Sequence, residues 1–225
     1  WFDGTNVSEA DATLDSQIAT TTNNWSLSFW LLHKGNVHTY DFIFGSGANK
    51  NIGLADGSGD AKLYYRDGND VYNALSNAAF PQGEWVHTVI TATADTSMTA
   101  YINGAAQTTS TTMASGVSDP DTELVLDRFM EGFTATSYES LGSITEISYY
   151  DDVLTLAEAQ DLYNDGKAKS ALDASGSGNL VNYWRNNGLA EWEDLKGSND
   201  ANTNGVTETL LIPAGVDTPE AIVVL

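Results

Sequence analysis

The chain has 225 residues, of which 31 are acidic and 9 basic, and its formal net charge is −22. This charge disfavours binding to nucleic acids and to anionic membrane surfaces, because both require a positively charged protein face. Aromatic residues make up 10% of the chain and cysteine is absent, which excludes wholesale disorder, disulfides and thiolate metal sites.

Short strand-like segments separated by glycine, asparagine and aspartate predict an all-β fold. Residues 25–32 place Trp25, Leu27 and Phe29 on one face, with the period of two that a strand requires. Asn103-Gly104 indicates a tight hairpin turn after a further strand. The remaining predicted strands are residues 40–47, 51–59, 61–70, 83–93, 97–104, 122–129, 140–152 and 180–184.

One segment has a helical rather than a strand-like period. Its apolar residues are Leu156, Ala159, Leu162 and Tyr163. Thr155 is suited to the N-cap, Glu158 completes a capping box, and Gly166 stands where a helix commonly stops. We therefore expect one short helix near residues 155–165, whose apolar face closes one end of the β-structure.

The many short strands predict one two-sheet antiparallel sandwich over residues 1–185. Residues 186–225 form a turn-rich C-terminal extension, with Trp192 as the expected anchor. We expect this extension to pack on the sandwich or on a partner, and the apolar run at 221–225 to pair with a partner.

Two pairs of adjacent tyrosines are candidates for sugar binding, because sugars are commonly held against aromatic rings. In a strand, one member of each pair points inward and the other outward. One of Tyr64 and Tyr65, and one of Tyr149 and Tyr150, is therefore expected to be exposed. The alternative is that all four are ordinary packing residues of the sheets.

Four segments together resemble the laminin G-like and pentraxin-like domains of the concanavalin A-like superfamily. They are FDGTN (2–6), NNWSLSFWL (23–31), the hairpin GEWVHTVITATADTSMTAYINGAAQ (83–107) and LGSITEISYYDDVLTLAEAQDLYNDG (141–166). The resemblance covers roughly residues 1–185 and implies a concanavalin A-like jelly roll. Members of this fold include lectins, adhesins, hydrolases and virion proteins, so the fold does not by itself give the function.

The resemblance also implies a calcium site, because pentraxins bind calcium between two loops. The matching loops here are residues 45–51 and 128–140, and the ligands that they offer are Asn49, Asn51, Glu131 and Glu139. Phe129 and Met130 stand where pentraxins carry oxygen ligands, so the double site is not expected. A single calcium ion is the cofactor that remains, and Asp3 is a second place to look for a ligand.

The sequence does not predict a catalytic site. Glycoside hydrolases of this fold carry paired carboxylates on one strand, but after Glu9 and Asp11 a leucine, Leu14, takes the place of the next glutamate. Glu191 and Glu193 lie in a turn-rich segment rather than a clear strand.

The histidines do not suggest catalysis either. His87 lies within the signature hairpin, where a structural role is expected. His33 and His38 flank a segment that favours a solvated loop over a metal site.

The first functional hypothesis is a non-enzymatic surface recognition or structural protein, such as a phage virion component with a lectin-like domain. The second is a calcium-dependent carbohydrate-binding or adhesin module of a secreted bacterial protein, and the third, disfavoured, is a glycoside hydrolase. The expected partners are a glycan or neighbouring structural subunits, including further copies of the chain. The expected location is a virion surface or the extracellular space, without a membrane span.

Overall fold

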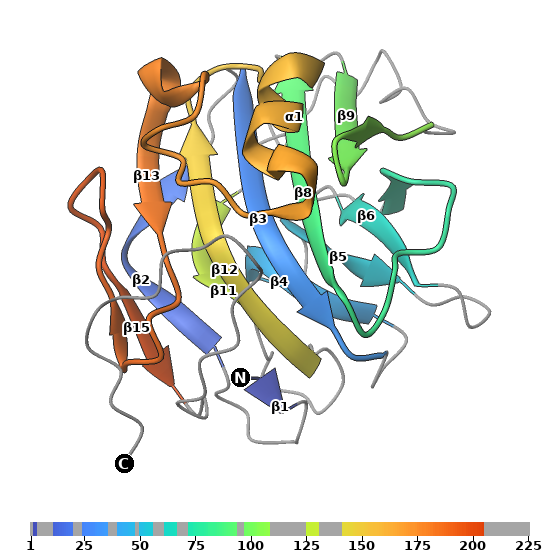
Figure 1. The fold of residues 1–225 in the computed structure, drawn as a ribbon. Coiled ribbons are helices and arrows are strands. Elements are labelled where there is room, and N and C mark those ends of the chain that lie inside the picture. Colours follow the sequence, from blue (N-terminus) through green and yellow to red (C-terminus); the bar gives the residue numbers. More distant parts are fainter. Residues whose placement is uncertain are drawn as a thin grey trace.

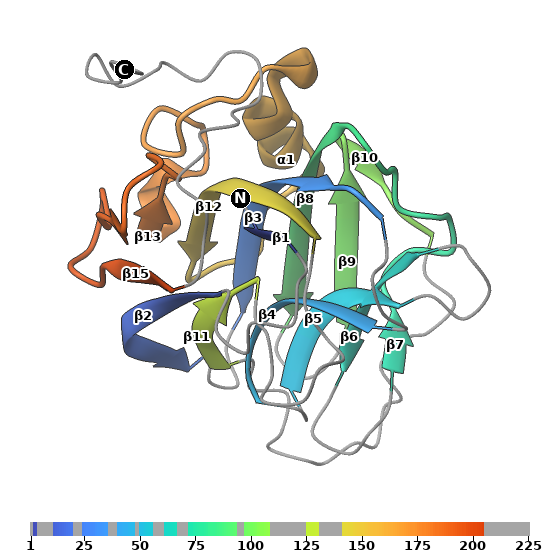
Figure 2. The same cartoon turned by 90° about the horizontal axis from the view of Figure 1, so that it is seen from below.

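The structure is a computed structural model that describes residues 2–3, 11–19, 24–35, 40–47, 50–55, 61–66, 72–93, 97–108, 125–130 and 141–204. Within these residues two antiparallel sheets face one another, and one short α-helix lies outside them (Figures 1 and 2). The predicted two-sheet antiparallel sandwich is confirmed. No helix of the described residues has the length and apolar character needed to cross a membrane.

Sheet A has seven strands in the order β1-β12-β3-β8-β9-β10, with β13 pairing with β12. Its central pairs, β12 with β3 and β3 with β8, run over most of their length. The strands are β1 (Phe2–Asp3), β3 (Trp25–His33), β8 (Trp85–Thr93), β9 (Ser97–Ile102), β10 (Ala105–Ala106), β12 (Leu141–Tyr150) and β13 (Leu180–Trp184).

Sheet B has eight strands in the order β14-β15-β2-β11-β4-β5-β6-β7. The strands are β2 (Asp11–Ala19), β4 (Tyr40–Gly47), β5 (Lys50–Ala55), β6 (Lys62–Arg66), β7 (Tyr72–Ala74), β11 (Val125–Phe129), β14 (Glu191–Trp192) and β15 (Ala201–Asn204). Because β15 pairs with β2, the segment after residue 185 adds strands to the jelly roll itself.

The main core lies between the sheets and follows the alternation seen in the sequence. Trp25, Leu27 and Phe29 of β3 point into it and are buried. Phe29 contacts Phe44 of sheet B edge-to-face, with ring centroids 4.8 Å apart. Such aromatic pairs contribute beyond the apolar area that they bury, and here they join the two sheets.

The helix α1 (Leu156–Tyr163) begins with the predicted capping box: Glu158 N donates to Thr155 Oγ1, and Thr155 N donates to the Glu158 carboxylate. It ends at Asn164, whose φ of 47° is left-handed, so the stop comes two residues before Gly166. Two 3₁₀ turns follow, η2 (Asn164–Gly166) and η3 (Ser177–Asn179).

The expected position of the helix at one end of the sandwich is wrong, because α1 lies across the outer face of sheet A (Figures 1 and 2). That face carries large apolar side chains, including Val89, Tyr150 and Tyr183. Together with Leu162 of α1 they form a second buried cluster. The apolar area of this face requires a cover, and the helix supplies it.

Hydrogen bonds connect the two sheets along both open sides of the sandwich. On one side Asn77 N, after β7, donates to Thr108 O, after β10, at 3.2 Å. On the other side Trp184 of β13 forms a bridge with Asp194, and its Nε1 donates to Asn199 O at 2.6 Å. Each open side of the sandwich is therefore bridged by hydrogen bonds at one point along its edge.

Candidate functional site

Three of the aromatic side chains that the structure describes keep part of their surface exposed: Trp85, Tyr101 and Tyr163. All three lie on the outer side of sheet A. Trp85 of β8 and Tyr101 of β9 alternate with Val86 and Ile102, which point into the main core. Tyr163 is the last residue of α1 and packs on the same face. We call these three side chains the aromatic surface.

Tyr163 is held in place by rings of the sheet below it. It stacks on Trp30 and on His87, with centroid distances of 6.0 and 6.1 Å and interplanar angles of 25° and 21°. Gly104 in the hairpin turn leaves room for this ring, because a Cβ there would lie 3.0 Å from Tyr163 Cδ1. Gln160 Nε2 donates to Gly104 O at 3.1 Å. The end of the helix and the turn therefore fix one another.

His87 has a packing role beneath this surface. Its Nε2 lies 3.0 Å from Ser28 Oγ, and its backbone exchanges hydrogen bonds with the turn residue Asn103. Burial lowers the pKa of His87 to about 3, so the ring is neutral at physiological pH. The neutral, buried imidazole is therefore a fixed surface on which the Tyr163 ring packs.

The prediction that one tyrosine of each adjacent pair is exposed is wrong. Tyr64, Tyr65, Tyr149 and Tyr150 are at most 8% exposed. Tyr149 belongs to the main core and Tyr150 to the cluster below α1, so both faces of β12 are covered at this point. Tyr65 lies in the main core, whereas Tyr64 lies against the backbone of Gly53, where an added Cβ would be 2.8 Å from the tyrosine hydroxyl. The alternation along a strand predicts on which face of the sheet a side chain lies, but it does not predict whether another part of the protein covers that face.

The predicted calcium ligands are not brought together by the described residues. Asn49, Glu131 and Glu139 lie outside them, and of Asp3 the structure describes only the strand β1, where it pairs with Leu141. Asn51 is in β5, is fully buried and pairs with Gly45 and Arg66 of the neighbouring strands. Within the described part of the chain no group of three His, Asp or Glu side chains is placed to hold a metal ion. Calcium binding therefore stays a prediction.

The structure brings together one buried pair that the sequence did not suggest. His33 is the last residue of β3 and Asp41 the second of β4, and both are fully buried. His33 Nε2 lies 2.9 Å from Asp41 Oδ2, which links sheet A to sheet B. The expected solvated loop at His33 is wrong, whereas His38 lies outside the described residues. The full burial of both side chains points to a structural contact between the sheets.

A second polar cluster, also missed, lies at the edge of sheet A. The carboxylate of Glu146 in β12 accepts hydrogen bonds from the Tyr183 hydroxyl and from Arg185 Nε, the latter at 2.6 Å. Burial raises the pKa of Glu146, an effect that Arg185 and Tyr183 partly offset. The sequence held a clue, since Ile144 and Ile147 are three residues apart, which indicates a bulge rather than a regular strand.

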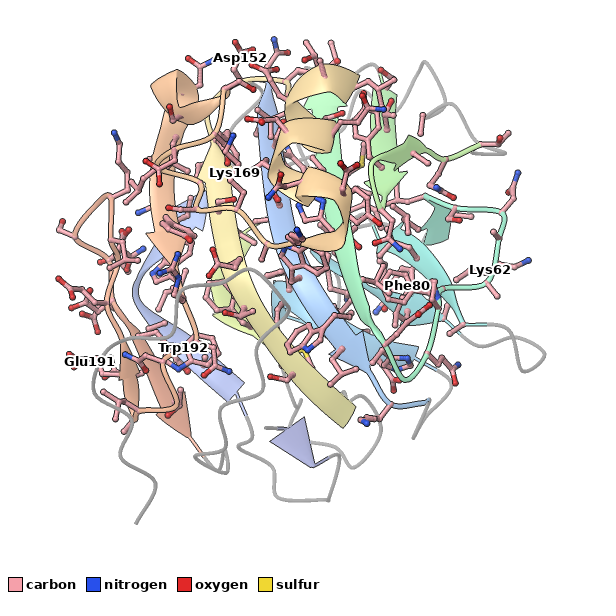
Figure 3. All side chains as sticks on the ribbon, viewed as in Figure 1. Lys62, Phe80, Asp152, Lys169, Glu191 and Trp192 are labelled. Carbon is pink, nitrogen blue, oxygen red and sulfur yellow. The ribbon has the colours of Figure 1, made fainter. Side chains whose placement is uncertain are left out.

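The acidic pairs considered for catalysis do not form a carboxylate site among the described side chains. Glu191 and Glu193 are exposed, while Trp192 between them is buried and confirms the expected anchor. Figure 3 shows Glu191 and Trp192 at the edge strand β14, on the opposite side of the molecule from Lys62. Glu9 lies outside the described residues, and Asp11 is described only as the first residue of β2.

The aromatic surface therefore differs from the other candidates in being partly exposed. The indole of Trp85 and the phenols of Tyr101 and Tyr163 are partly exposed. The amides of Asn103 and Gln160 lie at the Gly104 turn, which packs against Tyr163. This combination can contact a ring-shaped polyhydroxyl ligand, whose apolar face packs on the aromatic rings while its hydroxyls bond to amides.

Comparisons with known proteins agree with this architecture. Residues 4–160 match the family described as the concanavalin A-like lectin/glucanases superfamily. No curated protein sequence matches the chain.

Two solved structures share the fold over nearly the whole chain. A candidate carbohydrate-binding protein from Bacteroides ovatus is 15% identical with a TM-score of 0.59, covering 92% of this chain and 61% of that one. The heptameric SAP-like pentraxin of Limulus polyphemus is 11% identical with a TM-score of 0.56, covering 91% of this chain and 94% of that one. The chain thus spans less than two thirds of the Bacteroides ovatus protein.

Proposed function

The chain belongs to the concanavalin A-like lectin/glucanases superfamily, and from this we propose that it is a non-enzymatic glycan-binding domain whose ligand packs on the aromatic surface. The observation that carries the proposal is the position of Trp85, Tyr101 and Tyr163 on one face, while the other aromatic side chains that the structure describes are buried. Leaving rings partly exposed forgoes apolar burial, which a ligand can restore.

Two further observations support this proposal. The Bacteroides ovatus protein, a candidate carbohydrate-binding protein, has the same fold, which is compatible with a sugar ligand here. The buried carboxylate of Glu146 is held by Tyr183 and Arg185, and its side chain is only 3% exposed. A general acid must reach the bond that it protonates, so this group is unsuited to glycoside hydrolysis.

A glycan array of the full chain tests the proposal, run once with calcium and once with a chelator. We expect selective binding that Trp85→Ala weakens at least about tenfold, because stacking on an indole commonly contributes a large share of the contact area. Leu189→Ala is the control, since Leu189 is an apolar side chain that is 61% exposed in the turn before β14. Near-UV circular dichroism of each variant shows whether its fold is retained.

The same array distinguishes the alternatives. Binding that survives chelation agrees with a site made of aromatic side chains. Binding that chelation abolishes, and that Trp85→Ala leaves unchanged, would move the site to the loops that carry Asn49, Glu131 and Glu139. Silence from a folded sample would overturn glycan binding and favour a structural role among neighbouring subunits, as in a virion.

A further inference from the structure

Basic residues are absent from the elements that form the aromatic surface. Strands β8 and β9 and helix α1, which carry its three side chains, contain no lysine and no arginine, and neither does the neighbouring strand β10. In the sequence, Arg128 is the only basic residue between Asp67 and Gly166. Acidic residues do occur in this stretch, so lysine and arginine are depleted from it while charged residues in general are not.

Acidic residues flank two members of the aromatic surface in the sequence. Glu84 immediately precedes Trp85 and is exposed, and Asp165 is exposed two residues after Tyr163. Asp161 of α1 is already paired, because Lys169 Nζ lies 2.7 Å from its Oδ1. Figure 3 shows Lys169 on the side of α1 that faces β13, away from β8 and β9.

Two lysines lie at the margins of the surface. Lys34 follows β3, next to the point where Gly83 N donates to His33 O at 2.7 Å, and Lys167 follows η2. Both are exposed. Both enter the test below, because a cation at the margin attracts an acidic ligand.

Resting on the glycan-binding function proposed above, we infer that the aromatic surface selects uncharged glycans and rejects glycans that carry carboxylate or sulfate groups. An anionic sugar is commonly held by arginine or lysine, because a charge-assisted hydrogen bond compensates well for the water that the anion loses. The strands and the helix of this surface offer no such group. Amides and aromatic rings suffice for a neutral sugar.

The charge of the whole chain acts in the same direction. A net charge of −22 repels an approaching polyanion and slows its association, whereas an uncharged glycan is unaffected. This repulsion weakens as salt is added, because the Debye length falls from about 30 Å at 0.01 M to about 3 Å at 1 M. Discrimination should therefore be strongest at low ionic strength.

The test uses matched glycans that differ only in charge. The probes are N-acetyllactosamine with its sialylated and sulfated forms, dextran with dextran sulfate, and cellohexaose with its carboxymethylated form. Affinities for the full chain are measured at about 0.01 M and about 0.5 M salt. We expect the acidic member of any bound pair to bind about tenfold or more weakly at low salt, and the gap to narrow at high salt.

A pair of charge-reversing variants makes the test specific to this face. Glu84→Lys places a cation beside Trp85 and should narrow the gap between the neutral and acidic probes. Glu193→Lys makes the same charge change on an exposed residue next to β14, and should leave the gap as it is, apart from the small general change in net charge.

The outcomes separate this inference from the function on which it rests. Binding of an acidic probe as tight as that of its neutral partner at low salt would overturn the inference but leave glycan binding standing. If a Lys34→Gln, Lys167→Gln double variant then lost its binding of the acidic probe, these two lysines would be shown to supply the positive charge that holds it. Silence towards every probe would overturn the inference together with glycan binding.

Discussion

Among single residues, Glu146 combines a left-handed backbone with a buried charge. Its φ is 53°, a conformation that non-glycine residues rarely adopt, and it lies where the register between β12 and β3 shifts. Such a bulge turns the side chain away from the regular alternation. The carboxylate thereby reaches Tyr183 and Arg185 of β13 and its continuation. The cost of this backbone conformation is offset by a fixed link between two strands.

Replacement of this carboxylate should change how stability depends on pH. Burial raises the pKa of Glu146 above its usual 4.5, so the folded protein holds this proton more tightly than the unfolded chain does. Through this group the free energy of unfolding rises as pH falls through the folded pKa, and levels off below 4.5. Glu146→Gln should remove this slope, because the amide that replaces the carboxylate does not titrate.

Urea unfolding of the original protein and of Glu146→Gln between about pH 7 and pH 4 measures how the free energy of unfolding of each depends on pH. Glu193→Gln is the control, because it removes an exposed carboxylate and should shift neither the slope nor the midpoint. An unchanged pH profile in Glu146→Gln would contradict the assignment of the slope to Glu146.

A second carboxylate, that of Asp194, lies so close to position 197 that only glycine fits there without a clash. A Cβ at this position would lie 2.5 Å from Asp194 Oδ2 and 2.7 Å from Asn182 Nδ2. The carboxylate of Asp194 accepts hydrogen bonds from Asn182 Nδ2, at 2.6 Å, and from several backbone amides, so it has little freedom to move. Gly197→Ala should therefore lower the free energy of unfolding by about 2 kcal/mol.

Gly178→Ala is the matched control for this change, because no atom lies within 4 Å of the Cβ that it would add. Thermal or urea unfolding compares the two variants. Equal stability of the two would show that the loop around Asp194 relaxes freely.

Among the elements, α1 depends on a single cap for its first turn. Thr155 Oγ1 accepts a hydrogen bond from Glu158 N, and no basic residue lies in the last turn to add stability there. Thr155→Ala should cost about 1 kcal/mol of unfolding free energy. Thr108→Ala, at an exposed threonine outside the helix, should cost much less. A loss in Thr155→Ala no larger than in this control would argue against a stabilising role for the cap.

The elements that were predicted correctly are those whose signals come from residues close together in the sequence. The capping box of α1 and the alternation of β3 are local patterns, and both are confirmed. The exposure of the tyrosine pairs was predicted wrongly, because it depends on what covers the outer faces of the sheets. For Tyr150 that cover includes Leu162 of α1, in a helix expected at the end of the sandwich.

The polar clusters were missed for a related reason. Glu146 and Arg185 are 39 residues apart, and their contact requires the pairing of β12 with β13. His33 and Asp41 are close in sequence but belong to opposite sheets, so only the sandwich brings their side chains together. The aromatic surface likewise depends on where α1 ends above β8. The sequence therefore predicted the fold more completely than the site.

For the whole molecule, the folding unit extends beyond the family match at residues 4–160. Residues 180–204 supply β13 to sheet A, and β14 and β15 to sheet B. Trp184 and Trp192 are among the largest fully buried side chains, and Trp184 contacts Phe129 with ring centroids 5.1 Å apart. A core that loses two such residues loses several kcal/mol, which is comparable with the whole stability of a domain.

A chain shortened to residues 1–179 tests this view. It lacks both tryptophans and three strands, so we expect it to lose the cooperative thermal transition and the near-UV circular dichroism of the full chain. A cooperative transition in the shortened chain would show that residues 1–179 fold without the later strands.

The pairing of β2 with β15 determines how the molecule responds to tension. These two strands are neighbours in sheet B and antiparallel, and the pair Asp11–Asn204 stands at one end of their ladder. A pull on these two residues loads that end pair first, and then Ala12–Thr203, so the bonds break in succession rather than together. Rupture of this kind needs little force. A load applied between these two residues would therefore separate β15 from β2 pair by pair, starting from the end at Asp11 and Asn204.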